Sequence, residues 1–193
     1  MCKRCEWCLG EEIYIKYHDE EWGVPTFDDR RIFEFIILES AQAGLSWLTI
    51  LKKRENYRKA FYGFEPSIVA NFDEEDISTL MENSGIIRNR KKIEAAIGNA
   101  KTFIKIQEEF GSFSNYMWGY VNGKPIINTW ESIKEVPATT ELSDRMSADL
   151  KKRGFKFFGS VICYSHLQAL GVINDHITSC FRYNNVFELG YHK

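Results

Sequence analysis

Four residues of the kinds that bind metal ions lie near the two ends of this chain: Cys5 and His18, then His176 and Cys180. Zinc prefers four thiolate and imidazole ligands in a tetrahedron, and a spacing of four places His176 and Cys180 on one face if that stretch is helical. One ion bound by both pairs pins the chain ends together beside the aromatic residues around the first pair. The pattern predicts a closed structural zinc site next to a binding pocket.

A simpler alternative is two reduced core cysteines and two surface histidines, because a single Cys or His is more often structural. Cys2, Cys8 and Cys163 remain open as substitute ligands, although the apolar helical stretch around Cys163 indicates a packing role. Four suitable ligands together favour the metal site.

Glu39 follows the apolar run 35–38. Burial disfavours a carboxylate's charge, so a carboxylate beside a buried stripe needs a partner. Aromatic neighbours favour a cationic aromatic ligand that stacks on the rings while Glu39 accepts its N–H protons. The alternative, which is the commoner one for a helical Glu, is a side chain that faces solvent.

The next segment, Gln42-Ala43-Gly44-Leu45, combines small residues with one apolar tip. Such a tip can insert into a DNA duplex. Leu45 would then fill the space left by a displaced base, and Gln42 would contact the base opposite. Composition alone favours the alternative, a helix–helix turn with Leu45 in the core.

Residues 151–154 connect two helical stretches through Gly154. Free backbone N–H groups at the start of the second helix suit a DNA phosphate, and neighbouring basic residues add charge that does not read sequence. An equally weighted alternative is a C-cap glycine whose basic neighbours complement the helix dipole.

Apolar residues recur at helical spacing along most of the chain. Expected helices run from 28 to about 43, from 46 to 61, from 73 to 83, from 90 to about 108, and from 142 to 151, the last followed at once by a helix toward 171. Short strands are expected only between 122 and 137. The predicted fold class is all-α.

With 193 residues, 44% of them hydrophobic, the chain can build one core or two small lobes. Its formal net charge of −2 argues weakly against a polyanion partner, but basic runs at 52–54, 88–92 and 151–156 are separated from the acidic ones. Five cysteines and no leader-like apolar run favour the cytoplasm, and no stretch suits a membrane span. The sequence contains no catalytic-nucleophile signature, no P-loop and no dinucleotide-binding motif.

Six motifs occur in order: YHDEEWGVP (17–25), QAGLSW (42–47), LKKRENY (51–57), GIIR (85–88), KKRGFKF (151–157) and NDH (174–176). Together they resemble the bacterial 3-methyladenine DNA glycosylase I family of the helix-hairpin-helix superfamily. The resemblance implies a monofunctional DNA-repair glycosylase that hydrolyses the N-glycosidic bond of 3-methyladenine in double-stranded DNA, releasing the free base and leaving an abasic site. It also implies a monomer forming one glycosylase unit over 1–193, in which about 1–27 and 172–193 make a lobe packed on a helical lobe carrying the hairpin near 151–154.

The same resemblance assigns roles to residues. The base is to be held by Glu39, which is also the assigned catalytic residue, and by the other pocket residues Tyr17, Trp47, Trp7, Tyr14, Trp22 and Ser165. The DNA contacts are assigned to two segments. A DNA plug is formed by Gln42, Ala43, Gly44 and Leu45, and the hairpin contributes Lys152, Arg153, Gly154 and Lys156. A non-catalytic zinc is to be bound by Cys5, His18, His176 and Cys180.

Two departures are visible. Ser40-Ala41 replaces the Gly-Gln of the family, and Asn174 stands where superfamily relatives carry a catalytic Asp; the one-residue offset is expected to point Asp175 elsewhere. Because 3-methyladenine is cationic and departs readily, the resemblance implies that Glu39 and the rings select it while water attacks the sugar directly.

Three alternatives stay open. A damage binder shares these features without releasing base, and a bifunctional lyase needs a lysine nucleophile. A hydrolytic zinc enzyme is disfavoured because four protein ligands leave the metal no open position.

Overall fold

The computed structural model describes residues 3–190 and is mostly helical, as predicted. The α-helices are α1 (Glu12–Glu20), α2 (Asp29–Gln42), α3 (Trp47–Ala60), α4 (Pro66–Val69), α5 (Glu74–Glu82), α6 (Arg90–Phe110), α7 (Phe113–Gly119), α8 (Glu141–Arg153), α9 (Ser160–Ala169) and α10 (Arg182–Gly190). The described residues also form three short 3-10 helices, η1 (Glu6–Cys8), η2 (Tyr62–Phe64) and η3 (Ile133–Glu135), and two short strands, β1 (Ile126–Ile127) and β2 (Ile173–Asn174). No helix in the described part of the chain is long and apolar enough to cross a membrane.

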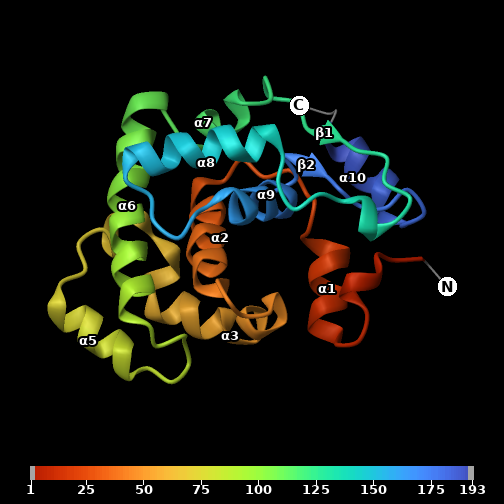
Figure 1. Ribbon diagram of the computed structural model, residues 1–193. Coiled ribbons are helices and arrows are strands. Elements are labelled where there is room, and N and C mark those ends of the chain that lie inside the picture. Colours follow the sequence, from red (N-terminus) through yellow and green to blue (C-terminus); the bar gives the residue numbers. More distant parts are fainter. Residues whose placement is uncertain (1–2, 191–193) are drawn as a thin grey trace.

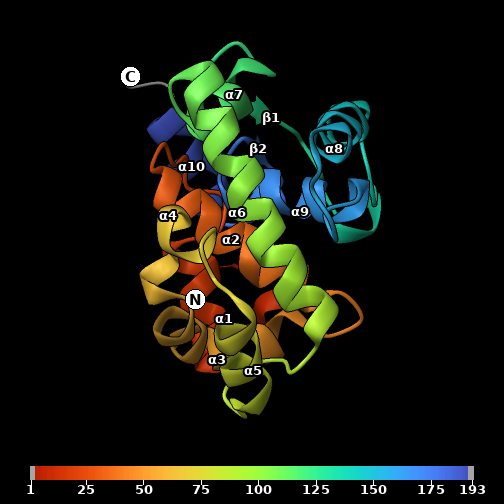
Figure 2. The ribbon, with the colours of Figure 1, turned by 90° about the vertical axis from the view of Figure 1, so that its left-hand side faces the viewer.

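Helix α2 is the centre of the molecule. It packs on α3, α6, α7 and α9; the long α6 stands beside it in Figure 1 and passes in front of it in Figure 2. Its residues from Ile32 to Ala41 are all buried, whereas the sequence predicted a single buried stripe. The additional buried face carries Glu39 and is covered by α9, a long-range contact that helical periodicity does not reveal.

Side chains cap the first turns of three helices. Asp28 accepts a hydrogen bond from the backbone N–H of Arg30, and Ser46 Oγ accepts one from that of Thr49 (3.2 Å). Asp73 and Asp76 form a reciprocal capping box on α5. Each cap uses backbone donors that have no partner within their own helix, which fixes where α2, α3 and α5 begin.

The connection between α8 and α9 is longer than predicted. Gly154 ends α8 at φ +114°, and its N–H donates to Lys151 while that of Phe155 donates to Leu150, a C-cap arrangement. The next N–H, of Lys156, donates to Asn99 Oδ1 (2.8 Å). Helix α9 begins only at Ser160, so the three N–H groups from Gly154 onward already have partners within the protein.

The N- and C-terminal parts of the described chain lie side by side. The N–H of Phe181 donates to the carbonyl of Lys3 (2.9 Å), and β2 pairs in parallel with β1. Gly171, just before β2, has φ +70°, and a Cβ there would lie 2.3 Å from the backbone nitrogen of Pro25. Close backbone packing therefore holds 171–174 against 23–25. The division into two lobes stays a prediction, and 1–2 and 191–193 lie outside the described residues.

Candidate functional site: a Cys/His cluster beside an aromatic pocket

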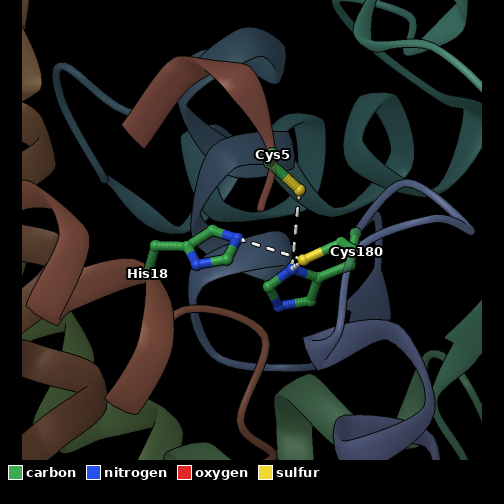
Figure 3. Close-up of side chains that lie close together, drawn as sticks. Cys5, His18 and Cys180 are labelled. Carbon is green, nitrogen blue, oxygen red and sulfur yellow. Dashed lines mark hydrogen bonds between the residues drawn. The ribbon is translucent and has the colours of Figure 1, made fainter. Parts of the chain in front are cut away.

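The four predicted metal ligands meet in one buried cluster. Figure 3 shows the side chains of Cys5, His18 and Cys180 coming together, and the donor atoms of all four residues, His176 included, lie within 4.8 Å of one another. His176 Nδ1 is 3.7 Å from Cys5 Sγ and 3.6 Å from Cys180 Sγ, which is 3.4 Å from His18 Nε2. Bond lengths of about 2.3 Å to sulfur and 2.0 Å to nitrogen separate such atoms by about 3.6 Å around tetrahedral zinc. The donor set fits a zinc ion.

Hydrogen bonds orient both histidines for this purpose. His18 donates Nδ1–H to Asp19 (2.8 Å), which is itself held by Arg4, and His176 donates Nε2–H to the carbonyl of Trp22 (3.1 Å). In this tautomer assignment each ring turns its unprotonated nitrogen toward the cluster. Outer hydrogen bonds of this kind are typical of histidines that bind metals.

Several ionisable groups of the cluster have shifted pKa values. A hydrogen bond from Cys5 lowers the pKa of the Cys180 thiol against the opposing effect of burial, and the same hydrogen bond, together with burial, raises the pKa of Cys5. Burial lowers the pKa of His176. Thiolate and neutral imidazole are the forms in which these side chains bind metals.

Two possibilities raised from the sequence do not hold for this cluster. His176 and Cys180 lie in the turn between β2 and α10, not on a helix; the turn is closed by a bond from the Cys180 N–H to the Ile177 carbonyl (2.8 Å). The alternative of surface histidines fails because His18 and His176 are 0% exposed.

The other cysteines have separate places. Cys8 donates to the carbonyl of Cys5 (3.1 Å), and Cys163 is packed in the core as predicted. Neither belongs to the described cluster of donor atoms. Cys2 lies outside the described residues.

A cavity of about 380 Å³ opens beside the cluster. All seven residues assigned to the base pocket line it, together with Gln42: Trp7, Tyr14, Tyr17, Trp22, Glu39, Trp47 and Ser165. The cluster and the cavity share a wall, because the Trp7 ring lies 5.3 Å from that of His18 and the Trp22 ring 4.5 Å from that of His176. The structure brings the predicted residues together, while their individual roles stay predictions.

The aromatic side chains form a continuous wall. Trp7 contacts Tyr14 and Trp22, with ring centroids 5.1 and 5.0 Å apart, and Tyr17 lies 5.5 Å from Trp47. Burial raises the pKa of Tyr17 well above its usual value, so its hydroxyl remains a hydrogen-bond donor at neutral pH. This wall offers π-faces and a donor to a planar ligand.

Glu39 faces this cavity and is 3% exposed, which rules out the solvent-facing alternative. Its Oε2 lies 2.7 Å from Nδ1 of His166, a fully buried residue of α9. Burial raises the pKa of Glu39, and His166 partly offsets the increase. Sequence reasoning missed His166; the available signal was a polar residue inside the apolar stretch 161–170.

Asp175 also lines the cavity, so the expectation that it points elsewhere was wrong. Its Oδ1 accepts hydrogen bonds from Asn128 and Trp130 (both 2.7 Å), and its Oδ2 accepts from Gln168 (2.6 Å) and from the Tyr164 hydroxyl. These four donors are uncharged, so they satisfy the buried carboxyl group at the pocket without adding positive charge. The side chain of Asn174 instead bonds to the backbone, because its amide N–H donates to the carbonyl of Tyr183.

The predicted plug protrudes from the end of α2. Leu45 is 41% exposed, which excludes the core alternative, and Gly44 has φ +81°. Lys92 of α6 donates from Nζ to the carbonyls of Ala41 and Ala43 (both 2.8 Å) and so fixes the base of the plug. Ser40 and Ala41, which replace the Gly-Gln of the family pattern, are buried.

The residues predicted to contact DNA at the hairpin differ in their exposure and in their contacts within the protein. Arg153 is paired with Glu109 (2.6 Å) and Asp149 (2.7 Å), whereas Lys152, Gly154 and Lys156 are exposed. The three backbone N–H groups from Gly154 have internal acceptors, so the C-cap alternative describes Gly154. A phosphate-binding role for this hairpin and for the start of α9 at Ser160 stays a prediction.

A family model described as methyladenine glycosylase matches residues 7–183 of this chain. The chain belongs to the methyladenine glycosylase family. DNA-3-methyladenine glycosylase 1 of Escherichia coli (strain K12) is 48% identical over 181 residues, covering 94% of this chain and 97% of the relative. DNA-3-methyladenine glycosylase of Haemophilus influenzae is 47% identical over 180 residues, covering 93% and 97%.

Solved structures agree with this family assignment. A crystal structure of 3-methyladenine DNA glycosylase I matches with a TM-score of 0.90 at 50% identity, covering 93% of this chain and 98% of the other. The enzyme from Staphylococcus aureus, solved to explain its recognition of 3-methyladenine, matches with a TM-score of 0.90 at 42% identity, covering 92% and 95%. The predicted family resemblance is confirmed over nearly the whole chain.

Proposed function

We propose that this methyladenine glycosylase turns 3-methyladenine out of double-stranded DNA into the aromatic pocket and hydrolyses its N-glycosidic bond. The products are the free base and an abasic site. The observation that carries this proposal is the buried Glu39 carboxylate on a cavity walled by Tyr17 and Trp47. The relatives named for 3-methyladenine, at 47–48% identity, support the choice of substrate.

Selection of the lesion rests on its positive charge. A methyl group on N3 makes adenine cationic, and a cation gains from π-faces and from a carboxylate in a site with little water. Glu39 is to accept the N–H protons of the base and Tyr17 is to donate to it, while Trp47 stacks on the ring. Unmodified adenine lacks the charge and leaves the Glu39 carboxylate without compensation, which disfavours its binding.

Hydrolysis then needs little acid–base assistance. The bond between the base nitrogen and C1′ breaks, the electron pair leaves with the base, and the departing base is neutral. Water adds to C1′ and releases a proton. Positive charge shifts to the sugar in the transition state, where the anionic Asp175 and Glu39 stabilise it electrostatically. The described lining residues of the pocket include no lysine, which disfavours a lyase nucleophile.

We also propose that one Zn²⁺ is bound by Cys5, His18, His176 and Cys180 in a structural role. Three separations between the donor atoms, 3.4 to 3.7 Å, match those around tetrahedral zinc, all four atoms lie within 4.8 Å of one another, and four protein ligands would leave the ion no open position for chemistry. The ion ties residues 5–18 to 176–180 and supports the wall that carries Trp7 and Trp22. A cytoplasmic monomer remains the expected state.

The decisive experiment measures which bases are released from methylated duplex DNA. The expected result is free 3-methyladenine with an abasic site and no strand cleavage, and no trapping of the enzyme on DNA by borohydride. Binding of methylated DNA without base release would instead identify a damage binder. Trapping by borohydride would identify a lyase.

A further inference from the structure

The partner of Glu39 has an unusual environment. His166 is 0% exposed, its Nδ1 lies 2.7 Å from Glu39 Oε2, and its Nε2 is buried without a hydrogen-bond partner in the described structure. The ring of Phe158 packs against the imidazole at 5.1 Å, with the two planes nearly perpendicular. One side of this histidine therefore meets a carboxylate and the other side is in apolar surroundings.

Three placements of protons are possible for the pair. In an ion pair, His166 carries protons on both nitrogens. If instead Glu39 is protonated and donates to Nδ1, the neutral ring carries its proton on Nε2. In the third placement, neutral His166 donates Nδ1–H to an ionised Glu39, and Nε2 is a bare acceptor.

The unpartnered Nε2 distinguishes these placements. The first two leave a buried N–H donor unsatisfied, and for the ion pair that donor is part of a cation. The third leaves only an acceptor lone pair, and buried acceptors without partners are tolerated better than buried donors. The surroundings of Nε2 therefore favour the neutral ring with its proton on Nδ1.

We propose that His166 is a positioning residue that holds Glu39 ionised as a neutral hydrogen-bond donor, so that the pair presents a net negative charge to the pocket. An imidazolium in the same place cancels that charge and removes the attraction for a cationic base. This inference rests on the proposed role of Glu39 in binding the base and adds a specificity-determining residue to it.

The other ionisable groups around the pair agree with this charge state. Tyr17 of α1 and Cys163 of α9 interact electrostatically with Glu39, and burial raises the pKa of both, so both are neutral near pH 7. Asp175 adds a second negative charge on the cavity wall. Lys92 of α6 is bound to the carbonyls of Ala41 and Ala43. Burial raises the pKa of Glu39 itself, and the hydrogen bond from His166 opposes that increase.

Two substitutions at one position separate a neutral donor from a cation. In His166→Asn, an amide N–H takes the place of Nδ1–H and can never carry a positive charge. In His166→Phe, ring volume is kept and the donor is lost. We expect His166→Phe to raise the pKa of Glu39, because the opposing hydrogen bond is lost, and to weaken binding of free 3-methyladenine at pH 7 by about tenfold or more. His166→Asn should stay within about threefold of the parent.

NMR tests the same inference in the unmodified protein. Carbon-13 labelling of glutamate, with Glu39→Gln to assign the signal, should show an ionised Glu39 at pH 7, and nitrogen-15 spectra should show His166 with its proton on Nδ1 and a bare Nε2. A protonated Nε2, or His166→Asn as impaired as His166→Phe in a folded protein, overturns the inference. Failure of the proposed function has a different signature, namely Glu39→Gln binding 3-methyladenine as tightly as the parent.

Discussion

The Trp22 carbonyl accepts a hydrogen bond from Nε2 of His176 (3.1 Å), and the Trp22 indole lies edge-on to the same imidazole with ring centroids 4.5 Å apart. One residue thus orients a predicted metal ligand and lines the base pocket. Gly23, next in sequence, leaves the space that this contact needs, because a Cβ there would lie 3.0 Å from His176 Nε2. We therefore expect the state of the Cys/His cluster to affect the shape of the pocket.

Removal of the metal should weaken base binding. We expect the parent to hold one zinc per chain by metal analysis, and chelation to lower its affinity for 3-methyladenine by about tenfold or more, as loss of supporting contacts at metal sites typically does. Cys5→Ser and His176→Ala should lose the ion. The control Cys8→Ser, whose hydroxyl keeps the bond to the Cys5 carbonyl, should retain it. One zinc in both ligand variants would rule out the proposed site.

Glu39→Gln should bind free 3-methyladenine about 10- to 100-fold more weakly in calorimetry, because a hydrogen bond to a charged group is worth about 1.5–3 kcal/mol. The amide keeps the size of the side chain and loses its charge. Glu75→Gln, which neutralises an exposed carboxylate on α5, is the control and should bind normally. Equal affinities for Glu39→Gln and the parent contradict a hydrogen bond from the base to an ionised Glu39.

Asp175→Asn should slow base release more than it weakens binding of the product. The variant removes a negative charge and places an amide N–H₂ group against the donors that now serve the carboxylate. We expect single-turnover release from methylated DNA to fall about 100-fold, the size found for loss of one electrostatic stabiliser. An unchanged rate in a folded variant contradicts electrostatic assistance by Asp175.

Lys92→Met should separate DNA engagement from base binding. Loss of the ammonium removes both hydrogen bonds to the Ala41 and Ala43 carbonyls, so the plug is no longer held at its base. We expect activity on methylated duplex to fall about tenfold, with the affinity for free 3-methyladenine unchanged. The neighbouring exposed Lys91→Met is the matched control for charge. A parallel loss in both assays contradicts a specific role in the plug.

Glu21 should make stability depend on pH in acid. Burial alone raises the pKa of Glu21, but Arg54 and Arg31 outweigh burial and lower it. The stabilisation is thus present above the unfolded pKa of about 4.3 and is lost as pH falls through the lower folded pKa. Near pH 7 we expect Glu21→Gln to unfold with about 2 kcal/mol less free energy than the parent. The difference between their melting temperatures should shrink below about pH 4; a constant difference contradicts this account.

The sequence predicted those features that depend on local pattern. Helical spacing located α2, α3 and α6, and Ser46 and Asp73 marked helix starts through their side-chain oxygens. Cys5 and His176 indicated the cluster because cysteine and histidine are the side chains that zinc prefers as ligands. These signals require no knowledge of how helices pack.

The features that were missed depend on tertiary contacts. His166 becomes the partner of Glu39 only because α9 packs on α2. Asp175 reaches the pocket because a turn after β2 directs it there, toward donors as far away as Asn128. The start of α9 was misplaced because the apolar Phe155 and Phe158 continue the helical pattern through a non-helical connection, in which Phe157 has φ +52°.

The pocket draws its walls from two distant stretches of chain, Trp7 to Trp47 and Ile133 to Asp175. During synthesis on the ribosome, the first stretch emerges long before the second. A nascent chain that ends before α9 has the aromatic rings and Glu39, but it lacks His166, Asp175 and half of the predicted metal ligands. We therefore expect the ability to repair DNA to arise only late in translation.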